Sequence, residues 1–302
     1  MSRLLPAVLV VGLLGGSAAA FAVTERLKLE RSPIFGTLVD KFVSPASGRR
    51  AKIVFRLRKS DRLSLAIVDS QDRVVRALID SRDVPAGRKT YTWDGRNDAG
   101  EIVPNGPYKP RVHLAGQHRT IVLPNPIAVD TKPPLISLTR TSLAEVSPDG
   151  DTRHDYLTVF FHTSEPARAV LYANGRQVVK QKSFKADSLK WGRGNGMPTK
   201  PGLYRLRLGA IDQAGNLGPQ TRAFTVRVRY VELGRRVIRA RAGGLISVRV
   251  TTDSHFYYWR IGARHGRVRS RRLVLAAGAP GRYRLVVSER GHRAAALVVV
   301  SP

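Results

Sequence analysis

The residue types that usually carry catalysis or bind metal ions are present in this 302-residue sequence, but none has the spacing that either task requires. The chain has no cysteine, which excludes disulfides, thiol nucleophiles and cysteine-based metal sites. Its seven histidines form no His-Glu-x-x-His motif and no close pair with zinc-ligand spacing. No Gly-x-Ser-x-Gly sequence marks a nucleophilic serine. We therefore predict that the chain is not an enzyme, and we expect no catalytic residue, cofactor or metal ion.

Two polar clusters could still be interpreted as sites. His154 is flanked by two acidic residues in a predicted loop, which we interpret as solvated polar sequence. The other cluster offers oxygen ligands of the kind that calcium prefers, from Asp94, Asn97, Asp98 and Glu101. The alternating ligand positions and the distal bidentate glutamate of an EF-hand are absent from it. We interpret this second cluster as a turn.

The charge is the most unusual property of the composition. Fifty-two lysines and arginines stand against 22 acidic residues, so the formal net charge is +30 at pH 7. Such a balance predicts attraction to a polyanion, such as nucleic acid, anionic lipid or an anionic wall polymer. A solvated surface with a bias toward arginine explains the same numbers equally well, because the arginines are scattered along the chain.

Residues 230–302 hold more of this charge than their length predicts. They contain fifteen arginines, no lysine and three acidic residues, a net charge of +12. The aromatic run at residues 256–259 lies beside several of these arginines, and together they could form a stacking surface for a polyanion or a glycan. In a strand, however, alternate members of this run would point into the core. The arginines that we predict to contact a polyanion are Arg264, Arg267, Arg269, Arg271 and Arg272.

The N-terminal residues favour export. Residues 4–23 carry no charge and are mostly apolar, and Arg3 gives them a short positive flank. Ala20 and Ala22 match the small-x-small pattern of a signal-peptide cleavage site, while about 20 residues also suffice for a helix that spans a bilayer. We expect residues 1–23 to be a hydrophobic helix, either a cleaved signal peptide or a retained membrane anchor. Both place the chain from about residue 24 onward outside the cytoplasm, where we expect no nucleic-acid partner.

The rest of the chain repeats a set of elements at a period near 100 residues. Trp93 and Trp191 lie 98 residues apart, and Tyr108 and Tyr204 lie 96 residues apart. Apolar and polar residues alternate in predicted strands, as expected for antiparallel sheets with one buried face. No amphipathic helix of useful length follows residue 30. Short strands, frequent turns and about 100 residues per unit predict an all-β chain of tandem immunoglobulin-like β-sandwiches.

The predicted domains follow from these repeats. Residues 24–45 are expected to be a linker, and residues 46–130, 131–229 and 230–302 to be three immunoglobulin-like domains. Proline-rich segments at 124–126 and 132–134 mark the first boundary. The third domain has the Gly-x-Tyr step before a strand but lacks the tryptophan element and is shorter, so we expect a reduced sandwich.

The recurring motif is interpreted as structural. A tryptophan can fill the space between two sheets, short polar side chains can bond turn amides, and glycines supply positive φ angles. The residues with this predicted role are Trp93, Asp94, Gly95, Asn97, Gly100, Gly106 and Tyr108 in the first unit, and Trp191, Gly202 and Tyr204 in the second.

The first unit resembles the immunoglobulin-like domain of flagellar hook-capping proteins. The likeness rests on the Thr-Trp-Asp-Gly-Arg-Asn-Asp-Ala-Gly-Glu sequence at 92–101 and the Pro-Asn-Gly-Pro-Tyr sequence at 104–108, and it covers about residues 50–115. The second unit resembles the wider group of bacterial immunoglobulin-like modules through residues 130–134 and 210–216. These resemblances imply an exported protein without catalytic residues, and they do not imply a flagellar role.

Two functions remain in view. The first is a non-catalytic structural or adhesion protein, secreted or held in the cell envelope, that binds an envelope protein or an anionic wall or lipid polymer. In that reading the N-terminal segment contacts the membrane if it is retained. The alternative is an accessory or substrate-binding subunit of an exported hydrolase whose catalytic part lies on another chain.

Overall fold

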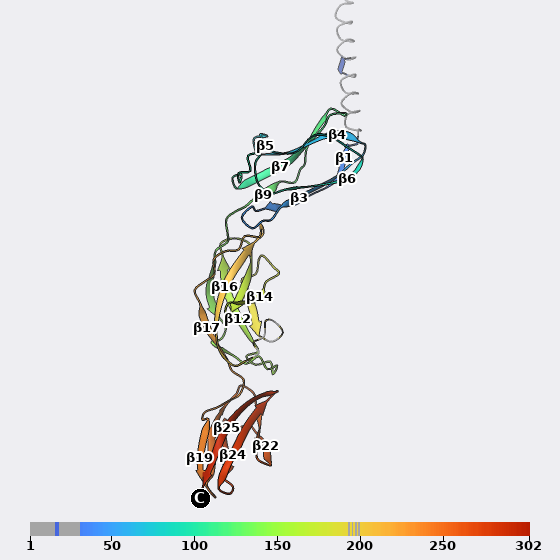
Figure 1. The fold of residues 1–302 in the computed structure, drawn as a ribbon. Coiled ribbons are helices and arrows are strands. Elements are labelled where there is room, and N and C mark those ends of the chain that lie inside the picture. Colours follow the sequence, from blue (N-terminus) through green and yellow to red (C-terminus); the bar gives the residue numbers. More distant parts are fainter. Residues whose placement is uncertain (1–15, 18–30, 193, 195, 197, 199) are drawn as a thin grey trace, which may run out of the picture. The chain divides into compact units, whose positions relative to one another are not determined.

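The computed structural model describes residues 16–17, 31–192, 194, 196, 198 and 200–302 (Figure 1). From residue 31 onward every described regular element is a β-strand, so the predicted all-β architecture is confirmed. The chain divides between Thr131 and Lys132 into two compact units, close to the boundary predicted from the prolines. The first unit contains one sandwich and the second unit contains two.

The predicted N-terminal helix lies almost wholly outside the described residues. Only Gly16 and Ser17 of the apolar stretch are described. Among the residues that the structure describes, no helix is long and apolar enough to cross a membrane.

The first sandwich packs a three-stranded sheet, ordered β1-β3-β6, against a larger sheet ordered β2-β9-β7-β4-β5, with β8 paired to β7. Its strands are β1 (Ile34–Val39), β2 (Phe42–Val43), β3 (Ala51–Leu57), β4 (Asp61–Val68), β5 (Val74–Val84), β6 (Gly87–Trp93), β7 (Gly106–Leu114), β8 (Arg119–Val122) and β9 (Ile127–Val129). The sandwich therefore begins at Ile34, within the segment 24–45 that we expected to be a linker. β1 belongs to it because it pairs with β3 and places Ile34 and Val39 in the core.

The second sandwich has the sheets β10-β12-β15 and β11-β17-β16-β13-β14. Its strands are β10 (Ile136–Thr141), β11 (Glu145–Val146), β12 (Tyr156–Thr163), β13 (Ala167–Ala173), β14 (Arg176–Lys180), β15 (Ser188–Gly192), β16 (Gly202–Asp212) and β17 (Phe224–Val228). The third has the sheets β18-β20-β23 and β19-β25-β24-β21-β22. Its strands are β18 (Glu232–Leu233), β19 (Val237–Arg241), β20 (Leu245–Thr251), β21 (Tyr257–Ile261), β22 (Arg264–Val268), β23 (Arg272–Ala276), β24 (Gly281–Glu289) and β25 (His292–Ser301).

The three sandwiches share one topology. In each, a three-stranded sheet faces a sheet in which a short early strand pairs in parallel with the last strand: β2 with β9, β11 with β17, and β19 with β25. The third sandwich, which we expected to be reduced, has the same strand order as the second. The third sandwich is therefore shorter because the connections between its strands are shorter, and not because it lacks strands.

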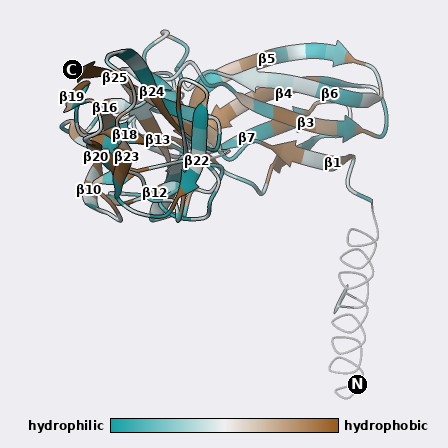
Figure 2. Ribbon diagram, turned by 90° about the horizontal axis from the view of Figure 1, so that it is seen from below, coloured by the Kyte–Doolittle hydropathy of each residue, from teal (hydrophilic) through white to brown (hydrophobic). Residues whose placement is uncertain are grey.

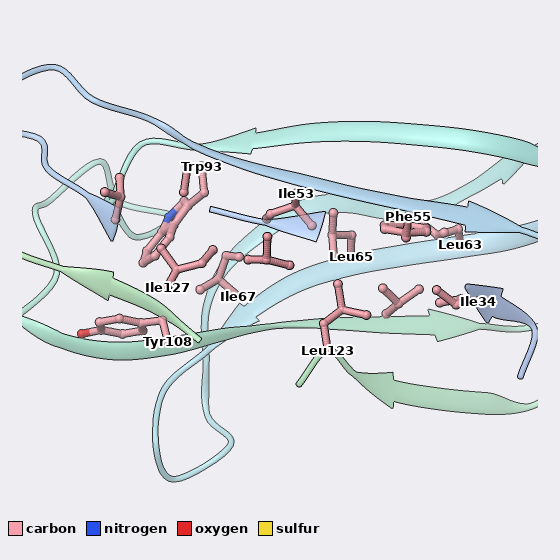
Figure 3. Packing of buried hydrophobic residues seen from close by; sticks show 14 of the residues in the cluster. Ile34, Ile53, Phe55, Leu63, Leu65, Ile67, Trp93, Tyr108, Leu123 and Ile127 are labelled. Atoms are coloured by element: carbon pink, nitrogen blue, oxygen red, sulfur yellow. The ribbon is translucent and has the colours of Figure 1, made fainter. Parts of the chain in front are cut away.

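Alternation of side chains along the strands builds the three separate cores. In β3, Ile53 and Phe55 are buried while Lys52 and Arg56 face solvent, as the sequence pattern predicts. Figure 2 shows the same change between hydrophobic and hydrophilic residues along the strands of the first sandwich. Figure 3 shows the result, a layer of apolar side chains held between the two sheets. Burial of this layer removes apolar surface from water, at roughly 25 cal/mol per Å².

Candidate functional site

The predicted structural motif in the first sandwich is held together by Trp93 and Tyr108. The Trp93 side chain is 1% exposed, and its Nε1 donates a hydrogen bond of 2.9 Å to the Arg96 carbonyl oxygen. The Tyr108 ring meets the indole edge to face, with ring centroids 5.3 Å apart. The Tyr108 hydroxyl donates a 2.9 Å hydrogen bond to the Pro104 carbonyl oxygen. Both polar groups are thus satisfied by nearby backbone, which lets two large aromatic rings be buried.

The turn after Trp93 uses the polar residues that could have formed a calcium loop. The Asn97 Oδ1 accepts a 2.8 Å hydrogen bond from the Glu101 amide. The Asn97 Nδ2 donates a 3.0 Å hydrogen bond to a Glu101 carboxylate oxygen. The Asp94 Oδ1 accepts from the Arg96 amide and the Asp98 Oδ1 from the Ala77 amide. These oxygens point at backbone amides within the sandwich, as short polar side chains do in turns. This geometry supports the interpretation of the cluster as a turn.

Glycine is required at one point of this turn. Gly95 has a φ of +79°, and a Cβ there would lie 2.8 Å from the Pro45 Cγ. Gly100, at φ +82°, and Gly106, at φ +154°, have open space around them, so their constraint is the backbone angle alone.

The second sandwich repeats the arrangement with the counterparts that the sequence predicts. Trp191 is fully buried, and its Nε1 donates a 2.7 Å hydrogen bond to the Gly196 carbonyl oxygen. Its ring lies 5.4 Å from that of Tyr204. The Tyr204 hydroxyl donates a 2.9 Å hydrogen bond to the carbonyl oxygen of Lys200, four residues earlier. Gly202, at φ +147°, occupies the place of Gly106.

The third sandwich keeps half of this arrangement. The Tyr283 hydroxyl donates a 2.9 Å hydrogen bond to the carbonyl oxygen of Ala279, again four residues earlier. Gly281, two residues before Tyr283, has a φ of +156°. The same corner, a tyrosine at the start of a strand bonded back to the chain, occurs in immunoglobulin-type sandwiches. It therefore recurs in all three sandwiches, whereas the tryptophan element occurs in the first two.

The outward face of the larger sheet in the third sandwich is rich in arginine. Side chains on one side of a sheet come from alternate residues of each strand. Inward residues of these strands, such as Tyr257, Leu285 and Val287, are buried, so their neighbours point outward. Seven of the fifteen arginines of residues 230–302 lie on this outward side: Arg239, Arg241, Arg260, Arg267, Arg282, Arg284 and Arg293. The five strands contain one acidic residue, Glu289, and it is 4% exposed and faces inward.

Part of this side forms a hollow, which we call the arginine face. Its volume is about 430 Å³. It lies across four neighbouring strands, β22, β21, β24 and β25. The arginine face is defined by the outward residues that line the hollow: Tyr258, Arg260, His265, Arg267, Val286, Ser288 and Arg293.

The five arginines predicted to contact a polyanion are spread over the third sandwich. Arg267 lies on the arginine face. The Arg264 Nη1 donates a 2.8 Å hydrogen bond to the carbonyl oxygen of Ala276, the last residue of β23 in the three-stranded sheet. Arg269 and Arg271 line a separate hollow of about 460 Å³, and Arg272 begins β23 in the three-stranded sheet. The structure thus brings Arg267 together with Arg260, which adjoins the aromatic run in the sequence, and with Arg293, which the sequence did not single out.

The aromatic run at residues 256–259 alternates as expected for a strand. Tyr257 is buried, and Trp259 packs partly buried against the same core. Phe256 and Tyr258 are exposed to 36% and 49%, and their rings meet edge to face at 5.7 Å. Half of the run is therefore core, and the other half is available to solvent beside Arg267.

Residues 44–117 match the family model of the FlgD Ig-like domain. This match covers β3 to β7 of the first sandwich and confirms the resemblance to hook-capping proteins that its motif predicts. It spans less than half of the chain. No curated protein matches the sequence.

Solved structures of tandem β-sandwich modules are similar to the chain at low identity. The fibronectin(III)-like modules of CbhA from Clostridium thermocellum share 15% identity, with a TM-score of 0.34 and coverage of 64% of this chain and 92% of theirs. The FN1–FN3 domains of chicken CNTN1 share 12%, with a TM-score of 0.25 and coverage of 90% and 100%. The I-band fragment I67–I69 of titin shares 11%, with a TM-score of 0.29 and coverage of 90% and 99%.

Beyond the FlgD Ig-like module, the second unit contains an acidic cluster that sequence inspection missed. Each of four side chains places a carboxylate oxygen within 4.8 Å of the others, and they are Asp149, Asp151, Asp253 and Glu289. An all-oxygen set of this kind could serve as ligands for a hard divalent cation. Asp149 and Asp151 lie in one loop, but Asp253 and Glu289 come from distant parts of the sequence, so local spacing could not reveal the cluster.

Burial sets the protonation of this cluster. Burial of Glu289, and then a hydrogen bond with Asp149, raises its pKa to about 7, although Ser254 and Thr252 hydroxyls donate to the carboxylate. Burial also raises the pKa of Asp253, whose Oδ2 lies 3.4 Å from the His154 Nδ1. Carboxylates gathered away from water disfavour their charged forms, and one proton shared between them relieves the repulsion.

Proposed function

We propose that this protein is a non-catalytic structural or adhesion protein, held in the cell envelope or secreted, whose third sandwich binds an anionic polymer. The observation that carries the proposal is the outward side of the β19-β25-β24-β21-β22 sheet, which bears seven arginines and no outward acidic residue. The tandem FlgD-type and related sandwiches support a structural or adhesion role.

The electrostatic argument favours a polyanion over a neutral partner. Arginines that share one side of a sheet repel one another, and a polyanion lowers that repulsion while it releases its counterions. Guanidinium groups also bind carboxylate and phosphate through two parallel hydrogen bonds, which lysine cannot do. The absence of lysine from residues 230–302 is consistent with this use of arginine.

A location outside the cytoplasm is part of the proposal. Its support is the uncharged stretch at residues 4–23 and the match of residues 44–117 to a domain of an exported protein class. Protease added to intact cells that express the full chain should degrade the sandwiches without cell lysis. Protection of the sandwiches until the cells are lysed would contradict this location.

The binding function is tested by co-sedimentation of the full chain with purified cell walls and with anionic vesicles over a salt series. Exposed charged contacts are screened within about 10 Å at 0.1 M salt, so binding should weaken steeply as salt rises. Vesicles without anionic lipid are the control. Failure to bind either polymer at low salt, or equal binding at low and high salt, would remove the proposal and leave the charge as a compositional bias.

A further inference from the structure

The arginine face has a regular internal geometry. The strand register places Arg267 opposite Tyr258, Tyr258 opposite Ser288, and Ser288 opposite Arg293. These four residues therefore form a row across β22, β21, β24 and β25. Neighbouring strands lie about 4.8 Å apart, so the backbones of Arg267 and Arg293 are separated by about 14 Å.

A second row lies beside the first. It places His265 opposite Arg260, and Arg260 opposite Val286. Arg260 therefore lies between the two ends of the first row, and Val286 supplies an apolar floor to the hollow of about 430 Å³. Pockets for small ligands typically have volumes of about 300–1,000 Å³ and are lined by hydrophobic and aromatic side chains with a few polar groups.

An aromatic edge holds one of the arginines in place. The guanidinium carbon of Arg267 lies 5.0 Å from the centre of the Phe256 ring, and Phe256 in turn contacts Tyr258 edge to face. Cation–π contact restricts the arginine without using its hydrogen-bond donors. Arg267 is therefore positioned beside an exposed tyrosine ring with donors that remain available.

The arginines of this face have no acidic partner among the residues that the structure describes. Within the described part of the chain, no carboxylate forms an ion pair with Arg260, Arg267 or Arg293. The other acidic residues of the sandwich are engaged elsewhere: Glu232 accepts hydrogen bonds from Arg227, and Asp253 lies beside His154. These arginines are therefore available to pair with an anionic ligand.

We propose that the arginine face binds a segment of an acidic polysaccharide, in which one sugar ring stacks on Tyr258 and carboxylates of the same chain pair with Arg267 and Arg293. This inference rests on the proposed polyanion binding and identifies its site and ligand class. The C–H face of a sugar ring packs on an exposed aromatic ring, while Ser288 and His265 can hydrogen-bond hydroxyl groups. A smooth layer of lipid headgroups would use the arginines but would leave the hollow and the tyrosine ring without a role.

The test is calorimetric titration of the full chain with oligogalacturonate, with its methyl-esterified form, with polyphosphate, and with phosphatidylglycerol vesicles, all at 0.15 M salt. Oligogalacturonate should bind best, and the methyl ester should bind at least about tenfold more weakly, because esterification removes the charge-assisted contacts to the arginines. Equal binding of polyphosphate and oligogalacturonate would overturn the sugar class. Preferred binding of vesicles would assign the face to membranes instead.

Variants locate the site on the sandwich. Tyr258→Ala and the double variant Arg267→Gln/Arg293→Gln should each weaken oligogalacturonate binding about tenfold or more. The matched control is Arg269→Gln/Arg272→Gln, which removes the same charge away from the face and should change affinity less than about threefold. Near-UV circular dichroism verifies that each variant is folded.

The outcomes separate this inference from the proposed function. Equal losses in the two double variants, or an unchanged affinity in Tyr258→Ala, would mean that binding is diffuse and would overturn the site while anionic polymer binding stands. Absence of binding to every anionic probe at low salt would remove both.

Discussion

The rings of Trp93 and Tyr108 meet edge to face in the core of the first sandwich, with their planes at 61° (Figure 3). The corresponding pair in the second sandwich, Trp191 and Tyr204, has the same interplanar angle of 61°. Two sandwiches with different surface sequences thus place the same two rings in the same way. In both sandwiches the indole and the hydroxyl each donate a hydrogen bond to a nearby backbone carbonyl, which satisfies both polar groups while the rings pack together.

Replacement of either tryptophan should unfold its own sandwich selectively. Trp93→Ala and Trp191→Ala each remove a fully buried side chain and leave a cavity, which should cost about 3–5 kcal/mol. Hydrogen exchange read by mass spectrometry should show lost protection in peptides of the altered sandwich and unchanged protection in the others. Uniform loss of protection across the chain would contradict the assignment of equivalent core positions.

The tyrosine corners should contribute a smaller and equal amount in each sandwich. Tyr108→Phe, Tyr204→Phe and Tyr283→Phe keep the ring but remove the hydroxyl that donates to the carbonyl four residues earlier. The loss should be about 1 kcal/mol in each case, the usual net contribution of a neutral hydrogen bond.

Tyr258→Phe is the control for these corner variants, because its ring is half exposed on the arginine face. It should leave stability unchanged in urea denaturation. A corner variant no less stable than this control would show that the hydroxyl contributes nothing to the fold.

Local patterns were sufficient to predict the strands and the repeated motif. Ile53 and Phe55 alternate with charged residues, and Trp93 and Tyr108 recur near 100 residues later, so sequence alone indicated sandwiches and their core. β1 was missed because its burial does not alternate along the strand, and β2 was missed because it has only two residues, too few to show a period. It is identified by its parallel pairing with β9, a contact that spans most of the sandwich.

The binding face was predicted only in part, for a geometric reason. Arg267 was found because it lies in a stretch of dense arginine, but Arg293 lies three strands away in the sheet and far along the chain. Only the register of β22, β21, β24 and β25 places the two arginines in one row. The acidic cluster escaped notice for the same reason, since a register or a loop contact has no signature in local spacing.

One glycine should tolerate no side chain although its φ angle is ordinary. A Cβ on Gly218 would lie 1.8 Å from the Pro134 carbonyl oxygen, a backbone atom that cannot move without displacing the start of the second sandwich. Gly218→Ala should therefore destabilise that sandwich by about 1–3 kcal/mol, as overpacking does. Gly278→Ala is the matched control, because nothing lies within 4 Å of its added Cβ. Similar thermal midpoints for the two variants would refute the prediction.

The buried carboxyl of Glu289 should make the stability of the third sandwich depend on pH. Burial raises the pKa of Glu289 from 4.5 to about 7 in the folded chain, so the folded state keeps a proton that the unfolded state loses near its ordinary pKa. Stability should then be greatest below the unfolded pKa and should fall as pH rises from 4.5 through 7. Several groups face this carboxyl: the carboxylates of Asp149, Asp151 and Asp253, the hydroxyls of Thr252 and Ser254 and, across the β24–β25 pair, His292.

Glu289→Gln removes this titration while it keeps the size of the side chain. The difference in unfolding free energy between wild type and Glu289→Gln, measured by urea denaturation at several pH values from 4.5 to 8, should move in favour of the variant as pH rises. Burial lowers the pKa of His292, and this contribution is present in both proteins, so the comparison removes it. Glu232→Gln, at an exposed ion pair with Arg227, is the control and should show no such change. A difference between wild type and Glu289→Gln that stays constant over this range would mean that Glu289 titrates near its ordinary pKa and that the cluster holds no shared proton.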